Sequence, residues 1–205
     1  MKNKFYTIWI SLILIIIFIL QIFINGFTDL FVLNNLAYSQ YWRFLTSIFL
    51  HSDITHLLFN LFALLFFGLS LERFLGSKRF LLIFLTSGII ANVIAVNFYE
   101  SSLGASGAIY GIIGALTIIS PFIMVWAFGL IMPLFVMSIL YVTADVLRTL
   151  GAFGPSNIGS IAHLSGIVIG MIFGFLFKKR RIKQLRSKIN INEHILKNWE
   201  DNYMR

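Results

Sequence analysis

The sequence predicts an all-α polytopic membrane protein, a bundle of six transmembrane helices in which the fourth helix is shortened. Of its 205 residues, 59% are hydrophobic and only 12% are charged, and the mean hydropathy is +0.89. Soluble domains carry roughly twice that charged fraction. Because a helix needs roughly 20 mainly apolar residues to cross the bilayer core, a chain of this length has room for six such helices and short loops.

Apolar runs place the expected helices near residues 7–26, 56–76, 79–99, 106–120, 122–142 and 160–177. The first run follows Lys2 and Lys4, as in a signal peptide. It exceeds the core of about 7 to 15 residues that a signal peptide has, so we interpret it as an uncleaved first helix. Residues 27–55 are expected to form a long loop of mixed polarity.

The distribution of basic residues predicts the orientation. With the N-terminus inside, the cytoplasmic side receives Lys2, Lys4, Arg73, Lys78, Arg79 and the whole C-terminal tail. Only Arg43 and Arg148 fall on or near the other side. The positive-inside rule therefore predicts a multi-pass protein with both termini in the cytoplasm. The Lys-, Asn- and Ile-rich composition without Cys favours a prokaryotic plasma membrane, with a mitochondrial membrane as the alternative.

We divide the chain into a membrane domain, residues 1–177, and a basic cytoplasmic tail, residues 178–205. The tail holds nine Lys and Arg against three acids, which leaves only +2 of the formal charge of +8 elsewhere. We interpret its first residues, Lys178-Lys179-Arg180-Arg181, as a stop-transfer anchor that meets anionic cytoplasmic lipids. The expected partners are therefore the lipid bilayer and anionic lipids, and nucleic acid is not expected.

The fourth apolar segment is unusually short. From Ser106 to Pro121 it covers about 23 Å at 1.5 Å per residue, against a bilayer core of roughly 30 Å. Irregular backbone at that depth is tolerated only inside protein or beside a watery cavity, so residues 100–105 are expected to enter such a cavity. The short helix therefore indicates a functional site in the outer part of the membrane.

Four polar side chains capable of acyl-transfer chemistry share that depth. His56 and Asn60 lie one turn apart at the outer end of the second helix, Ser106 begins the fourth, and His163 is one turn into the sixth. Ionisable residues inside a membrane are candidates for function. In this set His163 can act as base for Ser106, and His56 and Asn60 can donate hydrogen bonds to an oxyanion.

Small residues surround the predicted nucleophile and base. Gly104 and Gly107 near Ser106 allow a tight turn and close approach of a substrate backbone. The Ser106 amide, at a helix N-terminus, is a further oxyanion donor. Two small-xxx-small series let the fourth and sixth helices pack closely: Gly107 and Gly111, and Gly166, Gly170 and Gly174.

These motifs resemble the rhomboid family in order and spacing, from about Tyr41 to Phe177. The matching positions are Trp42-Arg43; His51, His56 and Asn60; Gly68, Glu72 and Gly76; Gly104-Ala105-Ser106-Gly107 and Tyr110; and Ala162-His163 with Gly166 and Gly170. In the family pattern, Tyr110 corresponds to the tyrosine that packs against the catalytic histidine. The absence of a seventh helix and of a preceding soluble domain resembles the compact six-helix form.

The resemblance implies an intramembrane serine endopeptidase with no cofactor and a water-filled site open to the outside. It implies a dyad of Ser106 and His163 without a catalytic acid. The implied substrates are single-pass or polytopic membrane proteins, cleaved within or next to their membrane segments.

The remaining polar residues have simpler explanations. His51 is expected to be structural, and Arg43, Glu72 and Asp145 are expected to serve in packing or loop anchoring. The outer histidines do not form a His-Glu-x-x-His helix, so no metal site is expected. The absence of Cys excludes disulfides, a thiolate nucleophile and Cys-ligated metals.

Several of these features are also compatible with functions other than proteolysis. A Gly-x-Ser-Gly sequence by itself is typical of helix packing, and a histidine such as His163 by itself can serve an interhelical hydrogen bond or a proton path. A non-proteolytic rhomboid-like membrane chaperone, binding unstable transmembrane helices, is the alternative, although such relatives typically lack the serine or the histidine. A small transporter calls for inverted repeats or several midplane charges, which the sequence lacks.

Overall fold

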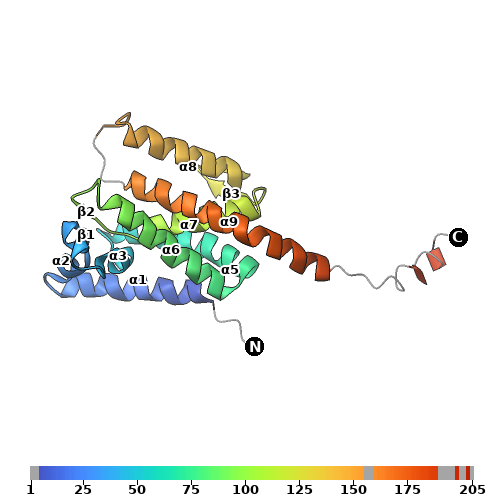
Figure 1. Ribbon diagram of the computed structural model, residues 1–205, viewed down its shortest axis with the longest axis horizontal. Coiled ribbons are helices and arrows are strands. Elements are labelled where there is room, and N and C mark those ends of the chain that lie inside the picture. The colour runs from blue at the N-terminus through green and yellow to red at the C-terminus, as the bar shows by residue number, and fades with distance from the viewer. Residues whose placement is uncertain (1–4, 155–158, 189–196, 199–201, 204–205) are drawn as a thin grey trace.

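Long helices dominate the computed structural model, which describes residues 5–154, 159–188, 197–198 and 202–203, with the backbone alone in 179–188 (Figure 1). In chain order the elements are α1 (Tyr6–Phe23), α2 (Phe27–Phe31), β1 (Leu33–Asn34), η1 (Asn35–Tyr38), α3 (Arg43–Thr46), η2 (Ser47–Phe49), α4 (Ile54–Ala63), η3 (Leu64–Gly68), α5 (Leu69–Leu75), α6 (Ser77–Ala95), β2 (Ser101–Ser102), α7 (Ser106–Ile119), β3 (Met124–Ala127), β4 (Leu130–Pro133), α8 (Leu134–Thr149) and α9 (Ser160–Lys188). A π-helical turn, η3, joins α4 to α5 in one continuous rod.

Helix α7 lies inside the bundle and packs most extensively against α9 and α6. Ten of its fourteen residues are buried, so it is apolar on nearly every side, as expected of a helix enclosed by other helices. At 1.5 Å per residue it is about 21 Å long, which confirms the predicted shortening of the fourth helix. Its first residue is Ser106, so the shortening sets the depth of that side chain.

The predicted all-α polytopic membrane fold is confirmed. In the described part of the chain, four helical stretches are long and apolar enough to cross a membrane by length and composition: Tyr6–Phe23, Ile54–Leu75, Ser77–Ala95 and Ser160–Lys178. With α7 they match five of the six expected spans, the starts agreeing within two residues. Two of the ends come three or four residues earlier than predicted, at Phe23 and Ala95.

The predicted fifth helix, residues 122–142, is wrong. Residues 124–133 form an antiparallel hairpin of β3 and β4, and α8 occupies 134–149. The two turn residues, Phe128 and Gly129, both have positive φ, 54° and 79°, which is the geometry of a type I′ hairpin turn. Pro133 is the last residue of the hairpin and the extended N-cap of α8. Hydropathy does not separate an apolar strand from an apolar helix, which explains the error.

The loop before α4 is more ordered than the mixed loop predicted for residues 27–55. Arg43 is 3% exposed, and its guanidinium donates to the carbonyls of Asp29 at 2.8 Å and Val32 at 2.7 Å. Strand β1 pairs antiparallel with β2, just before α7. Arg43 therefore anchors this loop, and the loop is tied to the segment that leads to Ser106.

Glu72 ties the opposite end of the rod α4–α5 to α1. Its carboxylate, 3% exposed, accepts hydrogen bonds from the amides of Tyr6 at 2.7 Å and Thr7 at 2.9 Å and from the Thr7 hydroxyl at 2.6 Å. A negative charge is favourable at the N-terminus of a helix, where the amides lack helical partners. Glu72 thus has the packing role expected from the sequence.

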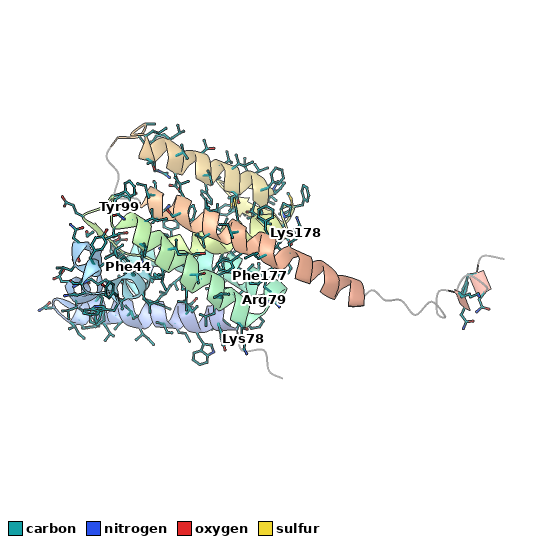
Figure 2. The ribbon with its side chains drawn as sticks, viewed as in Figure 1. Phe44, Lys78, Arg79, Tyr99, Phe177 and Lys178 are labelled. Atoms are coloured by element: carbon teal, nitrogen blue, oxygen red, sulfur yellow. The ribbon has the colours of Figure 1, made fainter. Side chains whose placement is uncertain are left out.

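Basic side chains gather at one end of the bundle. Figure 2 shows Lys78, Arg79 and Lys178 at that end and Tyr99 at the other, and the Arg79 guanidinium lies 5.4 Å from the centre of the Phe177 ring. Helix α9 continues through the predicted domain boundary at residue 177 as far as Lys188. The lipid contacts predicted for the tail fall mostly on residues that the structure does not describe, or describes without side chains.

His51 is a buried histidine in the turn before α4. It is 1% exposed, and its ring lies edge-on to that of His56, with centroids 5.0 Å apart. Burial lowers the pKa of His51 to about 4, and the nearby charge of His56 acts in the same direction, whereas Asp53 opposes it. His51 is therefore neutral at pH 7, in agreement with a structural role.

We expect Gly166→Ala to destabilise the fold, because a Cβ at Gly166 would overlap the carbonyl oxygen of Gly107 on α7. Overpacking of this kind lowers the free energy of unfolding by roughly 1–3 kcal/mol. Gly159→Ala is the matched control, because its Cβ would lie 3.8 Å from the Ala162 Cβ, an ordinary contact. Thermal unfolding in detergent micelles measures both, and equal melting temperatures would contradict the close packing of α7 and α9.

We expect His51 to make stability fall as the pH is lowered. The unfolded chain takes up this proton near pH 6.5 and the folded protein only near pH 4, so the unfolded state binds more protons between these values. The free energy of unfolding should drop by about 2 kcal/mol from pH 7 to pH 5 on account of this residue. Denaturation of wild type and His51→Gln at both pH values checks this, and parallel losses would refute it.

Candidate active site

Ser106 and His163 meet where the N-terminal ends of α7 and α9 lie side by side. Ser106 Oγ is 2.9 Å from His163 Nε2, a hydrogen-bond distance. His163 is 8% exposed, whereas Ser106 is half-buried. Glycines of α7 and α9 bring the two helices close enough for this contact, because a Cβ at Gly166 or Gly170 would overlap backbone of α7.

Gly104 forms the sharp turn that leads into α7. Its φ of +124° is one that other residues rarely adopt, and its amide donates to the Ser47 carbonyl at 2.9 Å. The Ser47 hydroxyl in turn accepts from the Asn92 amide at 2.9 Å. This turn is therefore fixed to η2 and, through Asn92, to α6, and it holds the start of α7 in place.

Tyr110 lies one turn beyond Ser106 and covers one face of the His163 ring. The two rings are stacked, with centroids 4.2 Å apart and planes 10° apart. On its other side Tyr110 approaches Tyr141 of α8, with centroids 5.9 Å apart. The stack restricts the plane of the imidazole beside Ser106.

His56 stands at the first turn of α4, facing Gly104. Its amide donates to the Asp53 carboxylate at 2.8 Å, which caps the helix; this hydrogen bond and one from the Ser52 hydroxyl lower the pKa of Asp53. The ring Nδ1 lies 3.1 Å from the Ser52 hydroxyl oxygen. The ring Nε2 points to the turn at Gly104, since a Cβ at Gly104 would lie 2.9 Å from this nitrogen.

Asn60 follows His56 by one turn and is 5% exposed. Its amide nitrogen donates to the His56 carbonyl at 2.9 Å, which leaves a second N–H on the same nitrogen. A half-buried serine, a histidine at hydrogen-bond distance and nearby donors on a second helix can together perform nucleophilic acyl transfer. The described residues offer no group of three His, Asp or Glu side chains arranged to hold a metal ion.

The structure adds Asp145 to the residues expected at the site. Its Oδ2 lies 3.2 Å from His163 Nδ1, and the residue is fully buried. Its Oδ1 accepts hydrogen bonds from Arg148 at 3.2 Å and from the Ser160 hydroxyl at 3.1 Å. The misplaced fifth helix hid this contact, because it ended three residues before Asp145. The sequence does contain one sign of a special role: Asp145 is the only acidic residue between Glu100 and Glu193.

Comparison with known proteins identifies the domain. The family model described as the rhomboid domain matches residues 38–180, a range that contains every residue of the site. The chain is 36% identical to YdcA of Bacillus subtilis over 148 residues, which cover 71% of each protein.

Longer relatives match over part of their length. The rhomboid protease GluP of Bacillus subtilis is 35% identical over 195 residues, covering 82% of this chain and 34% of GluP. The rhomboid protease GlpG of Yersinia pseudotuberculosis is 28% identical over 143 residues, covering 69% of this chain and 50% of GlpG. The site geometry and these matches agree, and the chain belongs to the rhomboid family, as a membrane-embedded hydrolase of the rhomboid protease type.

Proposed function

We propose that this protein is an intramembrane serine endopeptidase in which Ser106 is the nucleophile and His163 its general base. The observation that carries the proposal is the 2.9 Å approach of Ser106 Oγ to His163 Nε2 in a largely buried site. A serine hydroxyl is a weak nucleophile at neutral pH unless a neighbouring base takes its proton. The names of GluP and GlpG as rhomboid proteases support the same activity.

The chemistry proceeds through an acyl-enzyme. Ser106 Oγ forms a bond to the scissile carbonyl carbon while its proton passes to His163 Nε2. The C–N bond then breaks, and His163 returns the proton to the leaving amine. A water molecule next attacks the ester with His163 again as base, which releases the acid product and restores the Ser106 hydroxyl.

We expect three donors to stabilise the oxyanion. The Ser106 amide is at the first residue of α7, where helical partners are lacking, and the His56 Nε2 and the free N–H of Asn60 come from α4. Fixed donors of this kind stabilise the negative charge that develops in the transition state. The turn at Gly104 keeps these two groups of donors adjacent.

The substrates that we propose are membrane proteins, cut within or next to their transmembrane segments. The nucleophile opens a short helix enclosed by the bundle. Tyr99, at the end opposite the basic side chains in Figure 2, accepts a hydrogen bond from the amide of Ile161, two residues before His163. The positive-inside pattern therefore supports a site open to the extracytoplasmic side of the plasma membrane, both termini in the cytoplasm, and anionic lipids at the basic tail.

Labelling with a fluorescent fluorophosphonate tests the nucleophile without a known substrate. We expect the purified protein in detergent or liposomes to be labelled, and Ser106→Ala and His163→Ala to lose at least 99% of the labelling rate. The first variant lacks the nucleophile and the second lacks the base that activates it. Ser70→Ala is the matched control, because this exposed hydroxyl on α5 bonds only its own helix backbone among the described residues.

A folded wild-type protein that resists this probe and a second serine-reactive probe would contradict the proposed protease. That outcome would favour the non-proteolytic membrane chaperone. Melting temperatures of all variants show whether a lost label reflects lost chemistry or lost structure.

Gly104→Ala should impair the oxyanion donors while the protein stays folded. A Cβ there would lie 2.8 Å from His56 Cε1, and the φ of +124° is unfavourable for alanine. Since one misplaced oxyanion donor slows acyl transfer by roughly 10²-fold to 10³-fold, we expect a labelling rate lowered about 10²-fold. Gly129→Ala is the control. Gly129 also has a positive φ, but a Cβ there would have no neighbour within 4 Å, so this variant introduces backbone strain without a contact. Equal rates in the two variants would rule out this role for the His56–Gly104 contact.

A further inference from the structure

Asp145 is a buried charge that a dyad of Ser106 and His163 does not explain. It is fully buried, and it lies on α8, whereas the nucleophile and base lie on α7 and α9. A buried carboxylate is destabilising unless partners compensate it. The identity of those partners therefore indicates what the residue does.

The two carboxylate oxygens have different surroundings. Oδ1 accepts from Arg148 and Ser160, which is sufficient to tie α8 to the start of α9. Oδ2 lies 3.2 Å from Nδ1 of His163, the ring nitrogen that faces away from Ser106. One oxygen serves in anchoring, and the other is directed at the base.

This contact selects the tautomer of His163. A carboxylate can only accept, so its hydrogen bond requires the proton on Nδ1 and leaves the Nε2 lone pair directed at the Ser106 hydroxyl. The stacked Tyr110 ring fixes the plane of the imidazole but is indifferent to a half-turn that exchanges its edges. The Asp145 contact removes that ambiguity.

The same contact places a negative charge beside the imidazole when His163 takes the Ser106 proton. An imidazolium is stabilised by an opposite charge at hydrogen-bond distance, most of all where water is excluded. The other titratable or charged groups that face this pair are Tyr110 on α7, Arg148 on α8 and His56 on α4. Of these described groups and Asp145, the Asp145 carboxylate is the one that places a negative charge at hydrogen-bond distance from the ring.

We propose that Asp145 is a positioning residue that holds His163 in the tautomer and orientation needed to accept the Ser106 proton. The proposal rests on the function proposed above, and it adds to the dyad a third residue that touches neither substrate nor nucleophile. A purely structural Asp145 would act through its other partners, such as Arg148 and Ser160.

The test is the fluorophosphonate labelling rate of Asp145→Asn as a function of pH. Asparagine keeps the shape but can present its N–H₂ to Nδ1, which favours the wrong tautomer. We expect the rate to fall by about 10²-fold or more at neutral pH. The pH profile of the rate should also change, because the imidazolium loses its anionic neighbour.

Ser160→Ala is the matched control, because it removes one hydrogen bond to Oδ1 and leaves the Oδ2 contact with His163. We expect its labelling rate to stay within about threefold of wild type, with an unshifted pH profile. Equal rate losses in the two variants, or an Asp145→Asn pH profile that matches that of wild type, would overturn the positioning role. Labelling of Ser106 in the wild type would still support the protease. Absent labelling in folded wild type would instead overturn the protease itself.

A second measurement serves if Asp145→Asn does not fold. The measurement is an NMR spectrum of wild-type protein with ¹⁵N-labelled histidine. The ring signals of His163 are those that are missing from the spectrum of His163→Gln. We expect a protonated Nδ1 and an unprotonated Nε2 in the neutral ring. A proton on Nε2 would overturn the proposal.

Discussion

The close contact between α7 and α9 is the constraint on which the rest of the site depends. Glycines stand where side chains would otherwise separate the helices, and a Cβ at Gly166 or Gly170 would overlap the carbonyl oxygen of Gly107 or Gly111. In a membrane, helices gain little from hydrophobic association, so such close backbone packing is a main source of specificity. Because Ser106 and His163 lie at the N-terminal ends of these helices, the same glycines fix the distance between the proposed nucleophile and the proposed base.

The rod α4–α5 and the loop before it form the other side of the site. Arg43 fixes the loop through backbone carbonyls, Ser47 of the loop accepts the amide of Gly104, and His56 packs against the same glycine. The last two of these contacts join residues that are 57 and 48 positions apart in the chain. A substitution in the loop can therefore displace the proposed oxyanion donors without touching Ser106.

Most of the helices and the candidate site residues leave local signals in the sequence. Apolar runs mark most of the spans, the short run after Ser106 marks the buried helix start, and polar side chains are few at that depth. Residues 124–133 are as apolar as a helix, and only the geometry of Phe128, Gly129 and Pro133 makes them a hairpin. Once the fifth helix was misplaced, the contact of Asp145 with His163, 18 residues apart in the chain, had no local signal.

The three buried charged residues of the described bundle have different kinds of hydrogen-bond partners, and these partners indicate different roles. Arg43 and Glu72 are satisfied largely by backbone groups, carbonyls for one and helix amides for the other, so each holds a loop or a helix end in place. Asp145 is satisfied by side chains alone in the described contacts, and one of them is the predicted base. A buried ion pair is weak evidence for stability, since apolar residues of similar volume often serve as well. The arrangement around Asp145 is better explained by what it does to His163 than by what it adds to the fold.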